Sequence, residues 1–502
     1  MNEDVVFSAN KNQPTQESQV LSQPASVSSP PPSPVLPEPP SQQLDQPPVE
    51  NKIEESPLSP ELEGDSSGFF SSLPIAAIAK GIIGLFIVII VVFLAVSFIG
   101  PRLGQKTNQK ATINYWGLWE DSHIMQSVIS DFQKQNPNIT VNYTRQDIKQ
   151  YRERLSTRIQ NGTGPDIFRF HNTWFPMFSS VLLPLPNDTV NKSEFQKSYF
   201  PVIQSDLVKN GAVYGIPLEI DTLSLFVNTE ILKASGVLPP ATWDDFNKAS
   251  RALTVKDENG KIKTSGAAMG TFDNITHAPD IISLLFIQNG ADLKNLISTS
   301  QNASDALNFY TSFAMGEGNV WDETLDPSIL AFSKGNLAMY FGYSYDVFAI
   351  KAINSNISFQ VLPVPRLPGR KMTVASYWAE GVNAKSKFQK EALLFLNFLA
   401  KKETQQKIFS EESKTRLFGE PYSRIDLLDS LKNNDLVYVF AAQGKEAVSS
   451  FFASDTFDNG INSQMNGYLG NAVRSILGNT SAQSAVETLS KGVSQVLQQY
   501  GQ

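Results

Sequence analysis

The chain has 502 residues with 41% hydrophobic content, a formal net charge of −8, three histidines and no cysteine. This composition excludes disulfide scaffolds, thiolate metal sites and cysteine nucleophiles, and the length allows two or three globular units. Residues 1–68 hold eleven acids and two bases, a charge of −9, so the rest of the chain carries +1. The globular part therefore lacks the clustered basic excess of a nucleic-acid-binding protein.

Residues 1–68 form a low-complexity, acidic segment in which 13 of the first 60 residues are proline, including SPPPSPVLPEPP at 29–40. Few large apolar residues occur here, so burial cannot offset the loss of chain entropy. The composition predicts a disordered tail with polyproline II character. A spacer is the favoured role, and a proline-rich docking motif is the alternative.

A run of twenty uncharged residues, GIIGLFIVIIVVFLAVSFIG at 81–100, follows the tail. At about 1.5 Å per residue, a helix of this length crosses a hydrocarbon core of about 30 Å. The run predicts a transmembrane helix within 73–100, followed by a linker at 101–111. The start of the chain lacks the basic region of a secretory signal, so we expect 81–100 to be an uncleaved anchor. Cleavage after 95–97 is the alternative.

From residue 112 to residue 502 the chain alternates strand-like and helix-like segments. This order predicts α/β layers built on parallel strands with helical crossovers. We expect strands at 111–119, 139–143, 165–170, 335–342 and 359–365, and helices at 122–137, 151–162, 242–254, 304–314, 390–410 and 485–500.

The stretch GAVYGIPLEIDTLSLFVNTEIL at 211–232 places two carboxylates, Glu219 and Asp221, between strand-like runs. Residues two apart in an extended chain point to one face, so these acids project together. Because buried unpaired carboxylates are costly, we expect the segment to lie outside the deep core. A strand edge with solvated acids and a connection lining a polar cleft both fit this pattern.

Aromatic residues follow several predicted strands where each strand meets its loop: Trp119, Trp174, Trp378, Tyr343 and Tyr345. In open α/β sheets, ligands bind outside the carboxyl ends of the strands. Aromatics beside acids and amides at four such ends favour a ligand cleft over a purely structural role. We assign Trp243, in TWDDF, to the core.

Enzyme signatures for phosphate loops, dinucleotide binding, nucleophile elbows and zinc proteases are absent from the sequence. Glu120–Asp121 and Glu219–Asp221 match glycosidase carboxylate pairs by residue type only. DTFDNG at 455–460 lacks the ligands of a calcium loop and predicts a solvated turn. We expect no catalysis, no cofactor and no metal.

Several blocks carry a family resemblance: YWGLWED, GTGPDIFRF, GAVYGIPLEIDTLSLFVNTEILKASGV with LPPATWDDF, AFSKGNLAMYFGYSYD and AEGVNAKSKFQKEALLFLNFLA. Together they resemble the extracellular solute-binding proteins of ABC importers, specifically the sugar- and maltodextrin-binding family. The resemblance covers roughly residues 112–500. It implies a two-lobed periplasmic-binding-protein-like type II fold, with lobe 1 at about 112–220 and 372–436 and lobe 2 at about 221–371 and 437–502.

The resemblance also implies roles for individual residues. Asp221 matches a carboxylate that faces sugar hydroxyls, and Tyr345 matches an aromatic that stacks on a pyranose ring. His171 and Trp174 fall in a ligand-contacting loop, whereas YWAEG around Trp378 departs from the family's G-W-G. The expected ligand-binding set is Trp119, Glu120, His171, Trp174, Asp221, Tyr343, Tyr345, Trp378 and Glu380.

These inferences predict a membrane-tethered receptor that delivers a small solute to the permease subunits of an ABC importer, and a carbohydrate is the favoured solute. The family's lipidated cysteine is missing, and the apolar segment replaces it. Basic residues flanking 81–100 favour the C-terminal side inside, but the family places 112–502 outside and 1–72 in the cytoplasm. A surface sensor or adhesin of the same fold is the first alternative, and a glycan-acting enzyme is the second.

Overall fold

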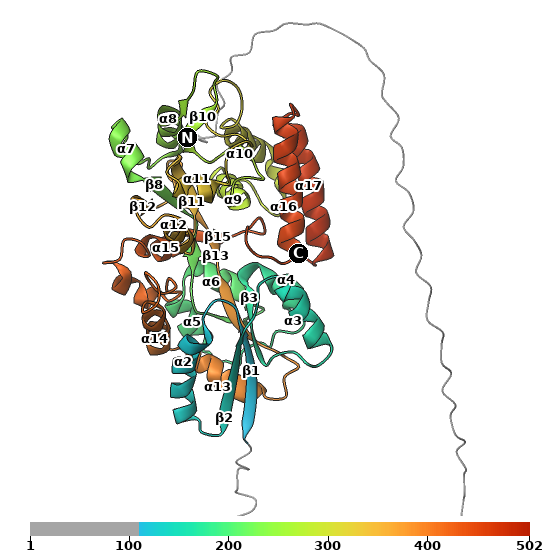
Figure 1. Ribbon diagram of the computed structural model, residues 1–502. Helices are drawn as coiled ribbons and strands as arrows, with labels where there is room; N and C mark the ends of the chain where they lie inside the picture. Colours follow the sequence, from blue (N-terminus) through green and yellow to red (C-terminus); the bar gives the residue numbers. More distant parts are fainter. Residues whose placement is uncertain (1–109) are drawn as a thin grey trace, which may run out of the picture. The chain divides into compact units, whose positions relative to one another are not determined.

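The computed structural model describes residues 110–502, which belong to one compact unit and form two α/β lobes (Figure 1). The tail at 1–68, the expected membrane helix at 73–100 and nearly all of the linker at 101–111 lie outside the described residues. Within residues 110–502, every helix is too short or too polar to cross a membrane.

The first lobe contains a five-stranded sheet in the order β2-β1-β3-β14-β6. β1 pairs in parallel with β2 and β3, whereas β14 is antiparallel to β3 and β6. The strands are β1 (Ala111–Gly117), β2 (Ile139–Arg145), β3 (Ile167–His171), β6 (Ile216–Pro217) and β14 (Trp378–Val382), beside a β4 (Val208–Lys209) and β5 (Ala212–Val213) ribbon. Every side chain of β3 is buried, because helices cover both faces.

The helices of this lobe come from three parts of the chain. They are α2 (Ser122–Gln135), α3 (Tyr151–Gln160), α4 (Phe175–Phe178), α5 (Lys192–Ser198), α6 (Pro201–Leu207), α13 (Gln389–Ala400) and α14 (Lys402–Glu412), with short 3₁₀ turns at Asn172–Trp174 and Ile425–Leu431. α2 buries one face at helical spacing, with Ile124, Val128 and Phe132 turned inward.

The second lobe contains a sheet in the order β12-β8-β11-β10-β9. Its strands are β8 (Ser224–Asn228), β9 (Val255–Lys256), β10 (Ile262–Ala267), β11 (Leu337–Gly342) and β12 (Phe359–Leu362). β8 is antiparallel to β11 and β12, and only β10 and β11 pair in parallel among these strands. The expectation of parallel strands therefore fits β1, β2 and β3 of the first lobe, and it is wrong for β14 and for most of the second lobe.

The helices of the second lobe are α7 (Thr229–Ser235), α8 (Trp243–Ala252), α9 (Ala278–Gln288), α10 (Ser300–Thr311), α11 (Ser328–Ser333), α12 (Asp346–Ile353), α16 (Ile461–Leu477) and α17 (Ala482–Gln499), with a 3₁₀ turn at Leu296–Thr299. α16 and α17 form an antiparallel pair on one side of this lobe (Figure 1). All eleven residues of α9 are buried, so it lacks the one-sided pattern that marks a surface helix.

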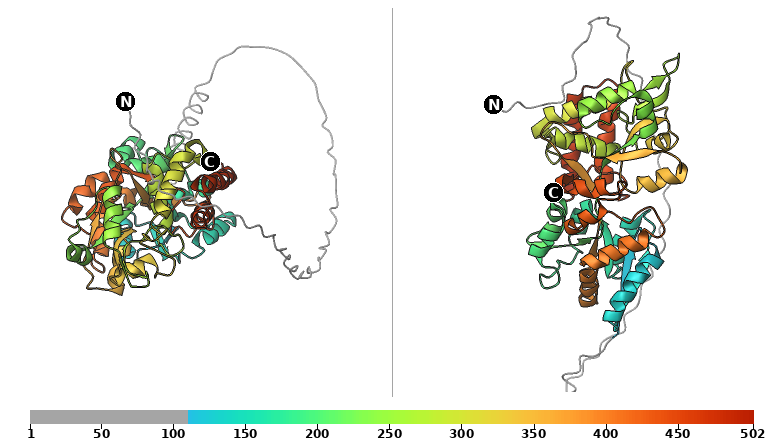
Figure 2. Two further views of the ribbon diagram at one scale, coloured as in Figure 1. Left: turned by 90° about the horizontal axis from the view of Figure 1, so that it is seen from above. Right: turned by 90° about the vertical axis from the view of Figure 1, so that its left-hand side faces the viewer.

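Three short strands link the lobes in a separate sheet of order β15-β13-β7. β7 (Asp221–Thr222) leads from the first lobe to the second, and β13 (Thr373–Ser376) leads back into β14. β15 (Ala447–Ser449) follows α15 (Tyr438–Ala442) and the 3₁₀ turn Gln443–Glu446 on the way to α16. Figure 2 shows this linking region between the two lobes from a second side.

Most expected elements are confirmed within one or two residues at each end. Thr242 caps α8, since its hydroxyl accepts a bond from the Asp245 amide at 3.1 Å, and Trp243 is buried. The single helix expected at 390–410 is wrong: it is split into α13 and α14 because Lys401 takes an extended conformation, with ψ 143°. The lobe boundaries expected from the sequence stay a prediction.

Candidate functional site

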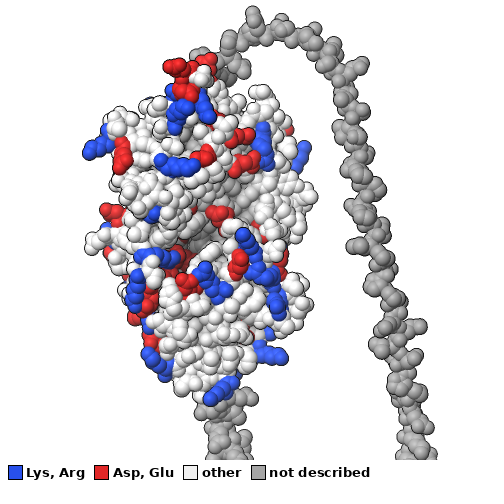
Figure 3. Space-filling model, viewed as in Figure 1, with Lys and Arg blue, Asp and Glu red and all other residues white. Residues whose placement is uncertain are grey.

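A cavity of about 860 Å³ lies between the lobes, at the level of the linking strands. Figure 3 shows a recess between the two halves of the described molecule, with charged side chains around it. The lining residues are Leu118, Trp119, Arg145, Gln146, Asp147, Ile148, Glu219, Asp221, Tyr345, Ser376, Tyr377, Trp378, Arg416, Glu420, Asp455 and Phe457. Most of them follow the ends of β1, β2 and β11 or belong to the crossing segments, as the strand-end rule predicts, and Arg416 and Glu420 come from the loop after α14.

Trp378 is the centre of an aromatic group on the first-lobe side of the cavity. Its ring meets the rings of Trp119, His171 and Trp174 edge to face, at centroid distances of 5.7, 5.0 and 5.1 Å. Edge-to-face contacts of this kind fix the orientation of a ring. Trp119 stays 37% exposed, so one indole of the group presents open surface to the cavity.

His171 and Trp174 hold this group from behind the cavity wall. Trp174 is fully buried and stacks on Phe178. The ring nitrogens of His171 lie 2.7 Å from Thr173 Oγ1 and 3.0 Å from Ser376 Oγ. Burial lowers the pKa of His171 to about 3, so the ring is neutral and positions Trp378 without adding charge.

A pair of stacked tyrosines forms the second-lobe side of the cavity. The rings of Tyr343 and Tyr345 are 5.7 Å apart and within 16° of parallel. Tyr343 is buried and donates to Asp280 at 2.8 Å, while Tyr345 is 39% exposed and donates to Asp455 at 3.1 Å. The stacking and the hydrogen bond therefore fix the Tyr345 ring, and the face that does not contact Tyr343 is turned toward the cavity.

Asp221 ties the linking strand to the loop that carries Tyr345. Its Oδ2 accepts from the Ser344 amide at 2.8 Å and from the Ser344 hydroxyl at 2.6 Å, and its Oδ1 accepts from the Thr222 amide at 2.9 Å. Burial raises the pKa of Asp221, and the bonds from Ser344 oppose that shift. Both carboxylate oxygens already have protein donors.

Glu219 lines the same cavity but accepts fewer hydrogen bonds than Asp221. The two side chains share a face, as alternation predicts, and each is only 5% exposed. The expectation that this stretch lies outside the deep core is therefore wrong, because the cavity wall itself is buried. Glu219 Oε1 accepts from the Trp378 amide at 3.2 Å, and Oε2 has no donor among the described residues.

A buried ion cluster centred on Arg169 lies behind this wall. Arg169 sits in the middle of β3 and is fully buried. Its guanidinium donates to Glu380 at 2.6 Å and to Glu120 at 2.8 Å. Burial raises the pKa of Glu380 to about 7, although Arg169 opposes that shift. Glu120 and Glu380 are thus partners of Arg169 rather than part of the cavity surface.

A second buried cation, His277, supports the tyrosine side. Its Nε2 lies 2.8 Å from Asp346 Oδ2, and its Nδ1 lies 2.7 Å from Ser454 Oγ and 3.7 Å from Asp455 Oδ2. Burial alone would lower the pKa of His277, but these carboxylates raise it to about 9, so the ring is an imidazolium at neutral pH.

The loop between β15 and α16 carries Asp455 and Phe457 to the cavity. Asp455, Phe457 and Asn459 all have positive φ, at 54°, 50° and 42°. Phenylalanine rarely adopts this conformation, and such strain concentrates at ligand clamps. Asp458 anchors the loop by accepting from the Asn462 and Ser463 amides at the start of α16, so DTFDNG is a structured turn.

Two arginines also reach the cavity, and each is engaged by protein carboxylates. Arg145, at the end of β2, pairs with Asp121. Arg416 donates to Glu420 at 2.8 Å and lies 2.8 Å from Glu412. The cationic side chains of the wall are thus already paired.

Of the nine residues expected to bind ligand, the structure places four on the cavity wall: Trp119, Asp221, Tyr345 and Trp378. The other five, Glu120, His171, Trp174, Tyr343 and Glu380, lie behind it and orient the four. The expected set omitted Glu219, the loop 145–148, Arg416, Glu420, Asp455 and Phe457. The strand-end rule, applied to β2, would have found residues 145–148.

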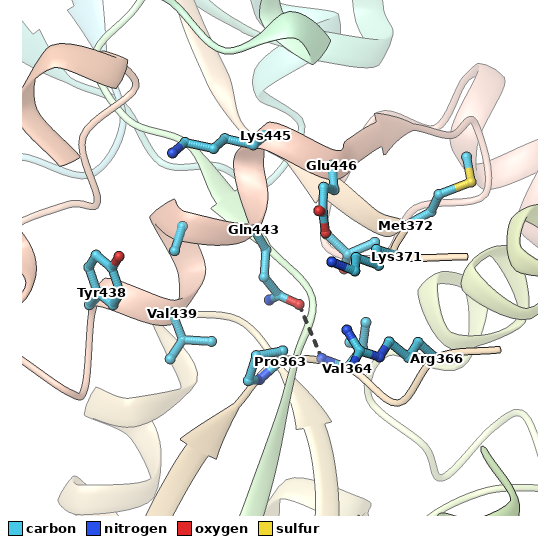
Figure 4. Close-up of a pocket in the computed structure, with 12 residues that line it drawn as sticks. Pro363, Val364, Arg366, Lys371, Met372, Tyr438, Val439, Gln443, Lys445 and Glu446 are labelled. Carbon is cyan, nitrogen blue, oxygen red and sulfur yellow. Dashed lines mark hydrogen bonds between the residues drawn. The ribbon is translucent and has the colours of Figure 1, made fainter. Parts of the chain in front are cut away.

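A smaller cavity of about 310 Å³ lies where the β12–β13 connection meets α15. Figure 4 shows Gln443 in it, accepting from the Val364 amide at 3.1 Å, with Arg366 and Lys371 nearby. Tyr438 is its only aromatic lining residue, so it lacks the aromatic faces of the larger cavity. Within residues 110–502, no three carboxylates or histidines are grouped to hold a metal ion.

The fold and the cleft are those of a two-lobed solute-binding protein, and comparison of sequences agrees. Residues 117–406 match the family model described as bacterial extracellular solute-binding protein. The chain belongs to this family, which is one of binding proteins and not of enzymes. The family resemblance inferred from the sequence motifs is confirmed.

Individual relatives share the fold across most of their length. The multiple sugar-binding protein of Streptococcus mutans is 24% identical over 71% of this chain and 87% of its own. A cyclo/maltodextrin-binding protein complexed with maltotetraose superposes with a TM-score of 0.64 at 19% identity, covering 77% of this chain and 97% of its own. The GacH receptor of Streptomyces glaucescens, solved unliganded and with acarbose, gives 0.61 at 20% identity, covering 78% and 99%.

Proposed function

We propose that this chain is a receptor that takes a carbohydrate into the cavity between its lobes and delivers it to an ABC importer. One observation carries the proposal: five aromatic residues, including Trp119, Trp378 and Tyr345, border an 860 Å³ cavity that five carboxylates also line. Sugar rings have apolar C–H faces that pack on aromatic rings, and polar rims that bond to carboxylates and amides.

The relatives support a saccharide as the solute. Two of those named above are described by the sugars that they bind, and a third was solved with acarbose. The cavity volume falls within the range of about 300–1,000 Å³ typical of small-molecule sites. The three linking strands supply a hinge, so a ligand that contacts both lobes would favour a closed arrangement.

A thermal-shift series on the full chain tests saccharide binding. Mono- and oligosaccharides are added in turn, and a ligand at a hundred times its dissociation constant is expected to stabilise the folded state by about 2.7 kcal/mol. Trp378→Ala, which removes the central ring of the aromatic group, is expected to abolish the shift. An unchanged melting curve across the series would refute the proposal.

The proposal includes a membrane tether. Residues 81–100 would anchor the chain, with 1–72 in the cytoplasm and 112–502 outside, where the receptor could meet permease subunits. The family's extracellular character and the twenty uncharged residues support this arrangement. Protease treatment of intact cells should cleave within 112–502 and spare the proline-rich tail. Cleavage of the tail alone would reverse the orientation.

A further inference from the structure

The walls of the cavity between the lobes carry more carboxylates than cationic side chains. Five carboxylates line it, from Asp147, Glu219, Asp221, Glu420 and Asp455, against two guanidiniums. Both guanidiniums are already paired with carboxylates of the protein. A ligand entering this cavity therefore meets a surface with a formal excess of three negative charges.

Glu219 is the carboxylate that the protein leaves uncompensated. Glu219 lines the cavity and is 95% buried, and its Oε2 is closed to solvent and has no donor among residues 110–502. Burying a charge without a partner is expensive. Asp221, two residues on, has donors on both oxygens, so of these two acids only Glu219 keeps an oxygen without a donor.

Arg169 does not supply the missing positive charge. Its guanidinium donates at 2.6 Å to Glu380 and at 2.8 Å to Glu120, and both of those carboxylates also keep a second oxygen without a donor. Burial raises the pKa of Glu219 well above its usual range, Arg169 opposes the shift, and Glu120, Glu420 and Glu380 add to it. A cation from outside would relieve this excess.

The chemistry of the surroundings favours an organic cation over a metal ion. No third carboxylate or histidine is placed to complete a metal site in the described part of the chain. Aromatic rings border the same cavity, and their negative faces attract ammonium groups. A primary ammonium also brings three donors, enough to satisfy Glu219 Oε2 and other nearby acceptors.

We propose that the cleft prefers a saccharide that carries a protonated amino group, and that this ammonium pairs with Glu219. The inference rests on the proposed function, because the sugar ring would occupy the exposed aromatic faces of Trp119 and Tyr345. It narrows the solute class from carbohydrates in general to amino sugars and their oligomers.

Calorimetric titration of the full chain with three matched β-1,4-linked tetrasaccharides tests the preference. The three bear a free amine, an acetamide or a hydroxyl at each C2. The free-amine form is expected to bind roughly 10- to 100-fold more tightly than the hydroxyl form. Glu219→Gln keeps the shape and removes the charge, and it should abolish the preference while neutral-ligand affinity changes less than about threefold.

Two further variants isolate the charge at this position. Glu219→Asp keeps the charge one methylene further back and should retain part of the preference. Glu258→Gln removes the same charge from an exposed turn that does not line the cavity, and the preference should persist.

The outcomes separate the two proposals. Equal affinities for the three tetrasaccharides, or a preference that survives in Glu219→Gln, overturn the inference and leave saccharide binding intact. The inference is also overturned if Glu258→Gln weakens binding of the free-amine form as much as Glu219→Gln does. The amine would then be attracted by the overall negative charge of the protein and not by Glu219. No binding of any saccharide overturns the proposed function and this inference with it.

Discussion

Two buried charge clusters support the cavity from opposite lobes, and they are built on different cations. In the first lobe, Arg169 holds Glu120 and Glu380 behind the tryptophan side. In the second, His277 lies between Asp346 and Asp455 behind the tyrosine side. A guanidinium stays charged at any accessible pH, whereas an imidazole titrates. The cation of the first cluster is therefore permanent, although its partner Glu380 has a pKa of about 7, whereas the cation of the second cluster is itself lost as pH rises.

The clusters also differ in what they fix. Arg169 joins β3 to β14 and to the end of β1, all strands of one sheet. His277 joins the start of α9 to α12 and to the strained loop at 453–460, which come from distant parts of the chain. Weakening the first should cost global stability, and weakening the second should loosen the loop and the Tyr345 ring.

Removing Arg169 is expected to have the largest effect. Arg169→Met leaves two buried carboxylates without a cation, which typically costs about 3–5 kcal/mol. Denaturant unfolding followed by circular dichroism measures the change. Adding Glu120→Gln and Glu380→Gln to this variant should restore part of the lost stability, because these substitutions remove the carboxylates that Arg169→Met leaves without a cation. Arg158→Met, at an exposed position of α3, is the control. If Arg169→Met lowers the unfolding free energy no more than this control does, the cluster does not stabilise the fold.

The contribution of His277 should disappear at alkaline pH. Its pKa is about 9 in the folded state, above the ordinary 6.5, so its stabilisation is complete below about pH 6.5 and is lost as pH rises through 9. The full effect is up to about 3 kcal/mol. Asp346, Asp455, Asp280, Tyr340, Tyr343 and Tyr345 surround the ring.

Unfolding free energies between pH 6 and 9.5 measure this slope. His277→Gln should flatten the decline, whereas His123→Gln, exposed on α2, should leave it unchanged. Parallel curves for the wild-type chain and His277→Gln would show that the imidazolium does not stabilise the second lobe.

Tyr345 should matter for binding more than for folding, since its ring is 39% exposed. Tyr345→Ala is expected to weaken saccharide binding roughly 10- to 30-fold, because a stacking face is lost. Tyr345→Phe keeps the ring and loses only the bond to Asp455, so its affinity should stay within about threefold of wild type. Calorimetry on both variants distinguishes stacking from hydrogen bonding, and equal losses would favour the latter.

Gln443 should give the smallest of these effects. Its amide donates to Ser224 Oγ at 2.8 Å and to Leu223 O at 3.2 Å, and it accepts from the Val364 amide, so it joins the linking strand to the second lobe. Gln443→Ala is expected to cost about 1–2 kcal/mol of stability. Gln498→Ala, exposed on α17, is the control. An equal loss of stability in both variants would show that Gln443 does not join the linking strand to the second lobe.

Local patterns located several helices and the aromatic residues at strand ends, whereas the two-lobed architecture followed from the family resemblance. Helical spacing of apolar residues located α2, and Thr242 marked the start of α8. The strand-end rule located Trp119, Tyr345 and Trp378 on the cavity wall. The sequence did not predict α9, because this helix is buried on every side and therefore lacks the one-sided apolar periodicity of a surface helix.

The charge clusters could not be predicted from local patterns because their members are far apart in the chain. Arg169 and Glu380 are separated by 211 residues, and only the antiparallel pairing of β14 with β3 brings them together. The sequence did hold one signal, an arginine in the middle of the strand IFRFH. An arginine in a fully buried strand requires carboxylate partners, although it does not say which.

A crystal structure of the full chain with the best-binding oligosaccharide tests the central claim most directly. The account predicts one sugar ring stacked on Trp119 or Tyr345 in the cavity between the lobes, with a donor of the ligand within hydrogen-bond distance of the Glu219 carboxylate. A saccharide bound elsewhere, such as in the smaller cavity beside Gln443, with the cleft between the lobes empty, would contradict it.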